Sequence, residues 1–480
     1  MTKAEGKRTH LANEQHTAGP KLELHFDAGT LVAPSCPADD ALQGLLPWDA
    51  RTGTHRAPAH RYAEIRERAL ALGVPLDDRA AAFSPLEVAL THPFSPFPHQ
   101  AQALAAWIAA ECRGVIELPT GAGKTLLAVL AIAHVQGPTL IVVPTLDLMQ
   151  QWKEVLSRHL SVEVGCIGGG LNEPRAVTVV TYDSAAFRTE FHGNRYALLI
   201  CDECHHLPAP RYQFIAEGSL APARLGLTAT LARADGGERI CEALLGPLVH
   251  RTEIGALQGA FLAPYEVHRI EVPLTDDEQR RYATSRSRYL GFLRKSGISF
   301  SSPSGWAQFV TRSQRTEEGR EAFAAYREQR RIALTSRAKL EVLWGLLRKH
   351  RDERVLVFTD DNETVYTLAH RLLVPALTHQ TPLSERRALL AGFSDGSLPV
   401  LLTSKVLNEG VDVPTASVAV VLSGSGSVRE HVQRLGRILR KVEGKRAVLY
   451  EVCSAHTTES AISDRRRQHG AYRPPPPEAP

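Results

Sequence analysis

The sequence predicts an α/β protein with two parallel-sheet domains in tandem, a small domain before them and a helical insert in the second. Short runs of β-branched residues and leucine alternate with helix-length intervals, a rhythm typical of parallel sheets covered by helices. This rhythm stops at about 277–337, where the sequence is charged, and then resumes. The length of 480 residues also requires several domains, because single cores stop growing near ~250–300 residues.

Composition divides the chain further. Residues 1–20 are polar and have no hydrophobic period, and the end of the chain is basic and rich in proline. Neither stretch can bury enough apolar surface to fold. The expected segments are a disordered lead at 1–20, a small N-terminal domain at 21–88, a first α/β domain at 89–255, a second at 256–460 with its helical insert at about 277–337, and a disordered tail at 461–480.

Apolar runs mark the expected strands. The small domain opens with the alternating run 22–26, which ends in the turn signal Asp27-Ala-Gly29. The expected strands of the two large sheets are 114–118, 139–143, 176–180, 196–200 and 224–227 in the first, and 355–358, 400–402, 418–422 and 446–450 in the second.

Charge and cysteine content narrow the class of protein. The net charge is only +4, but residues 277–337 hold thirteen Lys and Arg against six Asp and Glu. Such a segment can follow a nucleic-acid backbone, although a solvated helix face has the same composition. The seven scattered cysteines suit reduced thiols, and the sequence has neither a signal-type apolar run nor eighteen consecutive apolar residues. We therefore expect a soluble, cytoplasmic protein without a membrane partner.

A glycine-rich turn lies between the first expected strand of the large domains and an apolar helical stretch. In Leu118-Pro-Thr-Gly-Ala-Gly-Lys-Thr125 the glycines let backbone N–H groups approach phosphates, and the lysine adds a positive charge. A glycine turn without a ligand is the competing interpretation, but the strand before it and the helix after it favour a nucleotide site. The residues expected to bind phosphate are Thr120, Gly121, Ala122, Gly123, Lys124 and Thr125, with Thr125 also a ligand for Mg²⁺.

Two adjacent acids follow another buried run. Asp202 is expected to hold Mg²⁺ through water, and Glu203 to orient the attacking water. A zinc site is the alternative, since Cys201 and Cys204 precede two histidines. Four ligands within six residues cannot easily surround one ion, so we expect no zinc and interpret the cysteines as small core residues.

The second large domain has no phosphate loop but carries arginines 434, 437 and 440 near its end. On a helix two of them can reach one anion, such as the γ-phosphate held by the first domain. An arginine-rich surface helix is the alternative for this segment alone.

The ordered motifs resemble those of the superfamily-two helicases over roughly residues 95–455, which implies two RecA-like domains. Asp-Glu-Cys-His-His at 202–206 and Thr-Ala-Thr-Leu-Ala-Arg at 228–233 are similar to the XPB-type branch, as are Trp48–Arg51 and 56–62 in the small domain. The insert lies where that branch has a thumb-like insertion. The matching motifs are 97–100, 119–125, 143–145, 181–182, 202–205, 227–230, 357–359, 403–412 and 433–440.

The resemblance implies a role for each matching residue. Gln100 would read adenine, Lys124 would bind phosphate, and Asp202 and Glu203 would activate water. The second domain would contribute Asp412, Gln433 and the arginine fingers Arg437 and Arg440. The residues implied to couple hydrolysis to DNA or to contact it are His205, Thr228, Thr230, Arg233, Arg280, Arg281, Arg286, Arg288 and Arg294, with Lys295 beside them.

This chain departs from the strict phosphate-loop pattern at one place, which indicates a subtype of that loop, and from the family pattern at two. Leu118 replaces a glycine of the strict phosphate-loop pattern, and Phe97 replaces a frequent arginine of the adenine motif. The branch has Arg-Glu-Asp where this chain has Arg-Ala-Asp at 233–235, which brings strand separation into question. The insert also carries Phe292, Phe300, Trp306 and Phe309, most of which we expect in a small helical core.

The resemblance implies an ATP- and Mg²⁺-dependent DNA helicase or duplex translocase with 3′ to 5′ polarity, acting in DNA repair or remodelling. Its partners would be duplex or forked DNA and a nuclease, with the small domain as a DNA-recognition domain. The alternatives are an RNA helicase, the motor subunit of a restriction or nuclease complex, and a nucleic-acid-binding scaffold that does not hydrolyse ATP.

Overall fold

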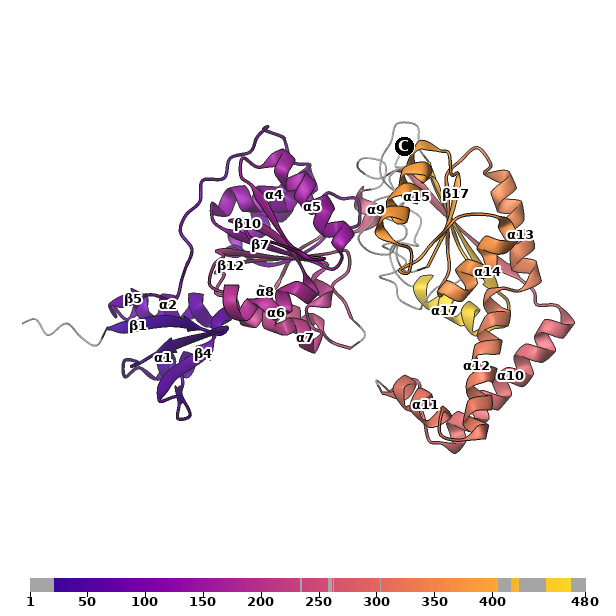
Figure 1. Cartoon of the computed structure of the whole chain (residues 1–480), viewed down its shortest axis with the longest axis horizontal. Helices are drawn as coiled ribbons and strands as arrows, with labels where there is room; N and C mark the ends of the chain where they lie inside the picture. The colour runs from indigo at the N-terminus through magenta and orange to yellow at the C-terminus, as the bar shows by residue number, and fades with distance from the viewer. Residues whose placement is uncertain are drawn as a thin grey trace, which may run out of the picture.

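The computed structural model describes residues 21–233, 235–257, 261, 263–302, 304–404, 416–422 and 446–467. These residues form one small and two large sheets, and a helical projection extends from the last domain (Figure 1). Both large sheets are built mainly from parallel pairs. This confirms the predicted α/β fold with two parallel-sheet domains.

The small N-terminal sheet has the order β3-β4-β2-β1-β5. Leu220 of the first large domain completes its core, and Asn194 bonds the backbone of Ala80 and Ala82. The small domain is therefore joined to the first large domain by packing as well as by hydrogen bonds. Its elements are β1 (Leu22–Asp27), β2 (Thr30–Ala33), α1 (Asp40–Leu45), β3 (Trp48–Asp49), β4 (Thr54–Pro58), η1 (Ala59–Arg61), α2 (Tyr62–Ala71) and β5 (Leu76–Asp78).

The first large sheet has the order β13-β6-β12-β11-β7-β10-β8-β9, and only its edge strand β9 is antiparallel to its neighbour. Its strands are β6 (Arg113–Glu117), β7 (Thr139–Val143), β8 (Val164–Gly168), β9 (Leu171–Glu173), β10 (Val177–Thr181), β11 (Leu198–Asp202), β12 (Ala223–Thr228) and β13 (Leu248–Arg251). Helices cover both faces, so the central strands are buried along their whole length.

Two core clusters lie on the two faces of this sheet. The first contains residues of α3 (Pro98–Ala109), α4 (Lys124–Val135) and α5 (Leu146–His159). The second contains residues of α6 (Tyr182–His192), α7 (Pro210–Glu217) and α8 (Glu238–Leu245). The short elements η2 (Cys204–His206) and α9 (Ile254–Leu257) complete the described helices of this domain.

The second large sheet has the order β14-β19-β18-β15-β17-β16. Residues of α13 (Arg337–Lys349) and α14 (Asn362–Leu372) pack on one face. The remaining elements are β14 (Tyr265–Val272), β15 (Val355–Phe358), β16 (Ala376–Leu377), α15 (Leu383–Asp395), β17 (Val400–Thr403), β18 (Val418–Val421), β19 (Ala447–Ser454) and α17 (Thr458–Arg467).

The insert consists of α10 (Asp276–Lys295), α11 (Gly305–Ser313) and α12 (Glu317–Leu334). A capping box between Thr275 and Glu278 starts α10, with three acids in the first turn. Phe292 and Phe309 are buried in the core of the insert, as expected, whereas Phe300 and Trp306 are 42% and 48% exposed. The insert therefore has a small core of its own and leaves two aromatic rings partly exposed.

A buried polar cluster joins the insert to the second sheet. Lys339 donates to Glu459 Oε2 and to the carbonyl of Leu422, both at 2.6 Å. Ser454 at the end of β19 donates through its hydroxyl to the carbonyl of Ala333 at 2.7 Å, and its N–H donates to Glu459 Oε2. The end of α12, the start of α13 and the start of α17 are thus fixed to one another.

Two sequence expectations need correction. The tail was expected to be disordered from residue 461, but α17 continues to Arg467. Asp464 of this helix accepts a hydrogen bond from Arg269 of β14, which is distant in sequence, and Ser463 is buried. The strand expected at 196–200 lies at Leu198–Asp202, so Asp202 is part of β11 itself. Within the described ranges, each helix is too short or too polar to cross a lipid bilayer.

Candidate nucleotide site

The glycine-rich turn connects the end of β6 to the start of α4, at the carboxyl ends of the parallel strands of the first large sheet. Gly121 and Gly123 have φ of 87° and 83°, in the left-handed region that favours glycine. A Cβ at Gly123 would also lie 2.2 Å from Gln100 Nε2. The loop conformation therefore requires glycine, and the first N–H groups of α4 remain available for an anion at its N-terminus.

Gln100 lies beneath this loop. Its Nε2 donates to the carbonyl of Ala122 at 3.1 Å, and its Oε1 accepts the N–H of Phe97 at 3.0 Å. The neighbouring His99 also bonds the carbonyl of Ala122. With only 1% exposure, Gln100 holds the phosphate loop in place, while the adenine-reading role implied for it stays a prediction.

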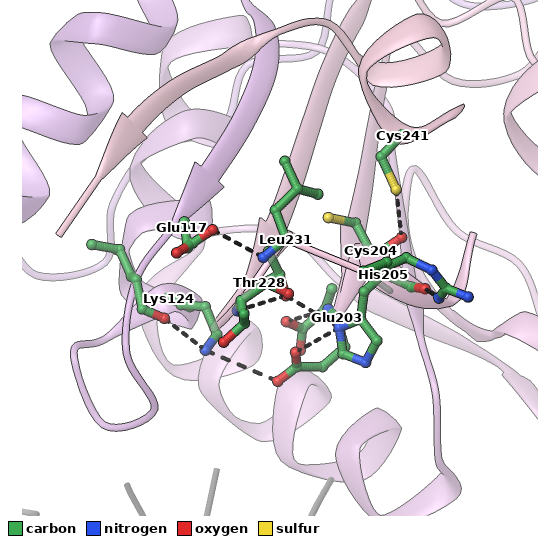
Figure 2. A network of polar contacts seen from close by, with 12 residues as sticks. Glu117, Lys124, Glu203, Cys204, His205, Thr228, Leu231 and Cys241 are labelled. Atoms are coloured by element: carbon green, nitrogen blue, oxygen red, sulfur yellow. Dashed lines mark hydrogen bonds and ion pairs between the residues drawn. The ribbon is translucent and has the colours of Figure 1, made fainter. Parts of the chain in front are cut away.

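Lys124 is the first residue of α4 and extends across the loop. Its Nζ donates to the carbonyl of Leu118 at 3.2 Å and lies 4.0 Å from Glu203 Oε1 (Figure 2). Thr125 follows in the first turn of the helix. Lys124 thus brings the loop and the acidic pair together, although 79 positions separate it from Glu203 in the printed sequence.

Asp202 ends β11 and is 5% exposed. Its Oδ2 accepts the indole N–H of Trp152 at 2.9 Å, and its Oδ1 accepts the N–H of Glu203 at 3.0 Å. Burial, followed by the adjacent carboxylate of Glu203, raises the pKa of Asp202 to about 6. A nearby cation would favour its charged form.

Glu203 adopts a left-handed conformation, with φ 46° and ψ 51°, which is uncommon for a residue with a side chain. Among the described residues, neither Glu203 Oε2 nor the buried Thr120 Oγ1 has a hydrogen-bond partner. The donor set of Asp202 and Thr125 consists of oxygen atoms, which is the kind that Mg²⁺ prefers. These observations fit a site for a nucleotide with Mg²⁺ and a water molecule.

A chain of polar contacts leads away from the acidic pair (Figure 2). His205 Nδ1 lies 3.5 Å from Glu203 Oε2 and 3.1 Å from Thr228 Oγ1, which in turn donates to the carbonyl of Thr230 at 3.1 Å. The structure therefore connects three residues implied to couple hydrolysis to DNA contact. A change at Glu203 can reach the end of β12 through this chain.

Arg233 comes soon after Thr230 in the sequence. Its contacts show which part of the Arg-Glu-Asp pattern this chain keeps at 233–235. Its guanidinium donates to the carbonyl of His205 and to both carboxylate oxygens of Asp235. The guanidinium of Arg233 lowers the pKa of Asp235 well below its usual range. The residues at the first and third positions of the Arg-Glu-Asp pattern are thus paired in this chain without the middle acid.

Sequence reasoning missed Glu117 and Trp152. Glu117 Oε2 accepts the N–H of Leu231 at 2.9 Å, and its Oε1 lies 3.1 Å from Arg251 Nε, so it fixes the segment after β12. An acid directly before the phosphate loop was a usable signal. No local pattern in the sequence indicated that the indole of Trp152 on α5 would donate a hydrogen bond to Asp202 at the end of β11.

Cys201 and Cys204 are fully buried in the second core cluster together with Cys241, as expected for small core residues. The described part of the chain contains no group of three or more His, Cys, Asp or Glu residues that could hold a metal ion. Asp412, Gln433, Arg437 and Arg440 lie outside the described residues, so their roles stay predictions.

The basic residues of the insert that were predicted to contact DNA divide into two groups. Arg280 and Arg281 lie near Asp277, Arg281 also pairs with Glu328, and Lys295 pairs with Glu318. By contrast, no ion pair within the described residues involves Arg286, Arg288 or Arg294. The second group is the stronger candidate for contacts with DNA, because its charge is not neutralised by a carboxylate.

A phosphate loop and an acidic pair on one parallel-sheet domain, followed by a second such domain, define a helicase-type nucleotide motor. Solved structures share this fold. They include S. cerevisiae Dbp5 bound to RNA and ADP BeF3, with TM-score 0.53 and 14% identity over 79% of this chain and 89% of that one. The Pyrococcus furiosus Hef helicase domain has TM-score 0.51 and 19% identity over 77% and 98%. Both are tandem RecA-like domains.

Family models match three segments: the res subunit of type III restriction enzymes at 93–233, the helicase conserved C-terminal domain at 338–442, and the damage recognition domain of the xeroderma pigmentosum group B helicase at 24–80. The DNA 3′-5′ translocase XPB2 of Sulfurisphaera tokodaii is 38% identical over 89% of this chain and 97% of its own. The DNA 3′-5′ helicase XPB of Mycobacterium tuberculosis is 33% identical over 74% of this chain and 60% of its own. The chain belongs to the XPB-type family of superfamily-two helicases.

Proposed function

We propose that this protein is an ATP-driven DNA translocase or helicase with 3′ to 5′ polarity that serves DNA repair or remodelling. The observation that carries the proposal is the connected chain from Lys124 through Glu203 and His205 to Thr228. It joins a phosphate-binding loop to the segment implied to sense DNA. The 38% identity to a protein named as a DNA 3′-5′ translocase supports the polarity and the choice of DNA.

The first domain supplies the groups for ATP hydrolysis. Backbone N–H groups of the loop and Lys124 would hold the phosphates, while Thr125 and, through water, Asp202 would hold Mg²⁺. Mg²⁺ bound there would neutralise part of the phosphate charge. Glu203 has its Oε1 4.0 Å from Lys124 Nζ, and its buried Oε2 has no hydrogen-bond partner among the described residues, so this carboxylate is placed to orient a water molecule and accept its proton.

The second domain would complete the site. We assign Asp412 and Gln433 to the nucleotide pocket and Arg437 and Arg440 to the γ-phosphate, on the basis of their motif positions. Hydrolysis would then require the two large domains to close on ATP, which converts the chemical step into movement along DNA. We propose 89–255 and 256–460 as the two moving bodies.

Three further proposals concern the small domain, a partner protein and the cellular compartment. The small domain at 21–88 would recognise DNA structure, since most of it matches a damage recognition domain. A separate nuclease would act with the motor in repair. The protein would work in the cytoplasm, where the scattered cysteines would stay reduced.

The test is ATP hydrolysis by the full chain with no nucleic acid, blunt duplex DNA, forked DNA, single-stranded DNA or RNA. We expect stimulation by DNA, and Glu203→Gln should abolish turnover while ATP and DNA binding persist. Removal of Mg²⁺ by EDTA should also stop turnover. Stimulation by RNA alone would refute the choice of DNA, and full activity of Glu203→Gln would remove Glu203 from its role.

Polarity needs a second assay. A triplex-forming strand is placed on a duplex that carries a single-stranded loading tail with either a 3′ or a 5′ end, and its displacement reports the direction of movement along the tailed strand. We expect ATP-dependent displacement only in the arrangement that requires 3′ to 5′ movement. Hydrolysis without displacement in either arrangement would indicate a nucleotide switch instead of a motor.

A further inference from the structure

A cavity of about 760 Å³ lies between the insert and the second large domain. One face of α12 forms one wall, and α14 forms the other, where the two helices approach each other (Figure 1). This volume lies within the roughly 300–1,000 Å³ typical of pockets for small ligands. The cavity is therefore large enough for a nucleotide unit but too small for a duplex or a folded partner.

An aromatic surface lines the end of the cavity nearest α11. The rings of Trp306 and Tyr326 lie 5.2 Å apart between centroids, and Phe323 lies 6.4 Å from Trp306. Phe309, which is completely buried, packs against Trp306 at 5.8 Å. Trp306 is thus supported by other rings yet remains 48% exposed, which is the arrangement that base stacking requires.

Guanidinium groups line both walls. Arg327, Arg330 and Arg331 belong to α12, whereas Arg371 belongs to α14. Arg330 is fixed by Asp360 and lies 6.0 Å from the centre of the Tyr326 ring. The contact of Arg327 with Glu363 is exposed on both sides and can be exchanged for a phosphate. Within the described residues, Arg371 makes no ion pair.

We propose that this cavity binds one or two nucleotides of single-stranded DNA, with a base stacked on Trp306 and the backbone phosphate between Arg327 and Arg371. This inference rests on the proposed function as a DNA motor, and it adds that the insert binds an unpaired strand. Aromatic faces beside arginines are the usual means of binding single strands, because an unpaired base exposes its ring face. In a duplex the same faces are stacked against neighbouring bases and cannot enter the cavity.

The test measures binding of the full chain to fluorescein-labelled oligo-dT, forked DNA and blunt duplex DNA by anisotropy. Trp306→Ala should weaken binding to oligo-dT and to the fork about tenfold relative to blunt duplex, as expected for the loss of one base–aromatic stack. Trp306→Phe should keep most of the affinity. Trp344→Ala is the matched control, because Trp344 is 50% exposed on α13 but does not line the cavity.

A second probe separates stacking from folding. An oligonucleotide without bases at its central positions should bind the wild type about as weakly as oligo-dT binds Trp306→Ala, and the two changes together should not add. Arg371→Glu should weaken binding to both single-stranded probes, whereas Arg348→Glu on the exposed side of α13 should not. Circular dichroism of each variant checks that the insert remains folded.

Two results would overturn the proposal. Equal loss of affinity for all three DNA substrates would mean that Trp306 acts through the fold or the duplex backbone. Unchanged affinity of Trp306→Ala for the single-stranded probes would remove the cavity as a nucleotide site. Failure of the proposed function gives a different result, since DNA would then not stimulate ATP hydrolysis by the wild type.

Discussion

Replacing Arg224 should destabilise the first large domain more than most single substitutions. Arg224 is 0% exposed and has no carboxylate partner among the described residues, but its guanidinium donates four hydrogen bonds to backbone carbonyls. The acceptors and distances are Ala216 at 2.9 Å, Ser219 at 2.6 Å, Ala221 at 3.0 Å and Leu244 at 2.8 Å. These carbonyls lie near the C-terminal ends of α7 and α8, where a cation also interacts favourably with the helix dipole.

The magnitude follows from these contacts. Four hydrogen bonds at about 1 kcal/mol each amount to roughly 4 kcal/mol. Burial lowers the pKa of Arg224, so removing the charge relieves part of a desolvation cost. We expect Arg224→Met to lower the free energy of unfolding by about 2–3 kcal/mol. For a domain of this size, that corresponds to a fall in Tm of about 5–10 °C.

The assay is thermal unfolding of the full chain by circular dichroism, with the exposed Arg195→Met in the same domain as control. Arg224→Lys should also lose stability, because one ammonium group cannot reach four carbonyls as the planar guanidinium does. An unchanged or higher Tm for Arg224→Met would refute the reasoning. It would mean that the cost of burying the charge exceeds the value of its four hydrogen bonds.

Three other predictions concern buried or interdomain charges. Lys339→Met should cost about 3–5 kcal/mol in urea unfolding, because it removes the ammonium group that balances the buried charge of Glu459, and adding Glu459→Gln should recover most of the loss. Burial lowers the pKa of His60 to about 4 from an unfolded value of 6.5, so its contribution to stability is complete above pH 6.5 and is lost as the pH falls towards 4. His60→Gln should flatten the dependence of Tm on pH in that window, and an unchanged slope would contradict this. Arg386→Glu should separate the two large domains in a fluorescence-transfer measurement, because Arg386 pairs with Asp147 across them, whereas exchanging the two charges should restore the distance.

Several strands could be predicted from sequence because a strand buried on both faces must be apolar throughout. The expected runs 139–143 and 355–358 coincide with β7 and β15. The end of β11 was missed because its last residue is a carboxylate, which the apolar pattern excludes. Asp202 is accommodated there by the indole of Trp152, a residue of α5. Such compensation is invisible to any pattern read along the chain.

The insert shows the same limit for charge and aromatic residues. Its composition predicted a basic surface, but carboxylates neutralise some of the charges. Arg281 of α10, for example, pairs with Glu328 of α12, which is distant in sequence. Of the four aromatic residues expected mostly in a core, Phe309 is buried and Trp306 lines a cavity. Their spacing along the chain does not distinguish them, because exposure depends on where the next helix packs.

The sequence by itself determined the α/β class, the family and the residues of the phosphate loop and acidic pair. These depend on local order: a strand, a glycine turn and a helix must follow one another for backbone N–H groups to meet a phosphate. Only the tertiary structure decided that Gln100 locks the loop, that Glu117 fixes Leu231, and that α12 and α14 enclose a cavity. Each of these contacts joins residues from elements that are separate in the chain, and their distances are set by how the helices and sheets pack.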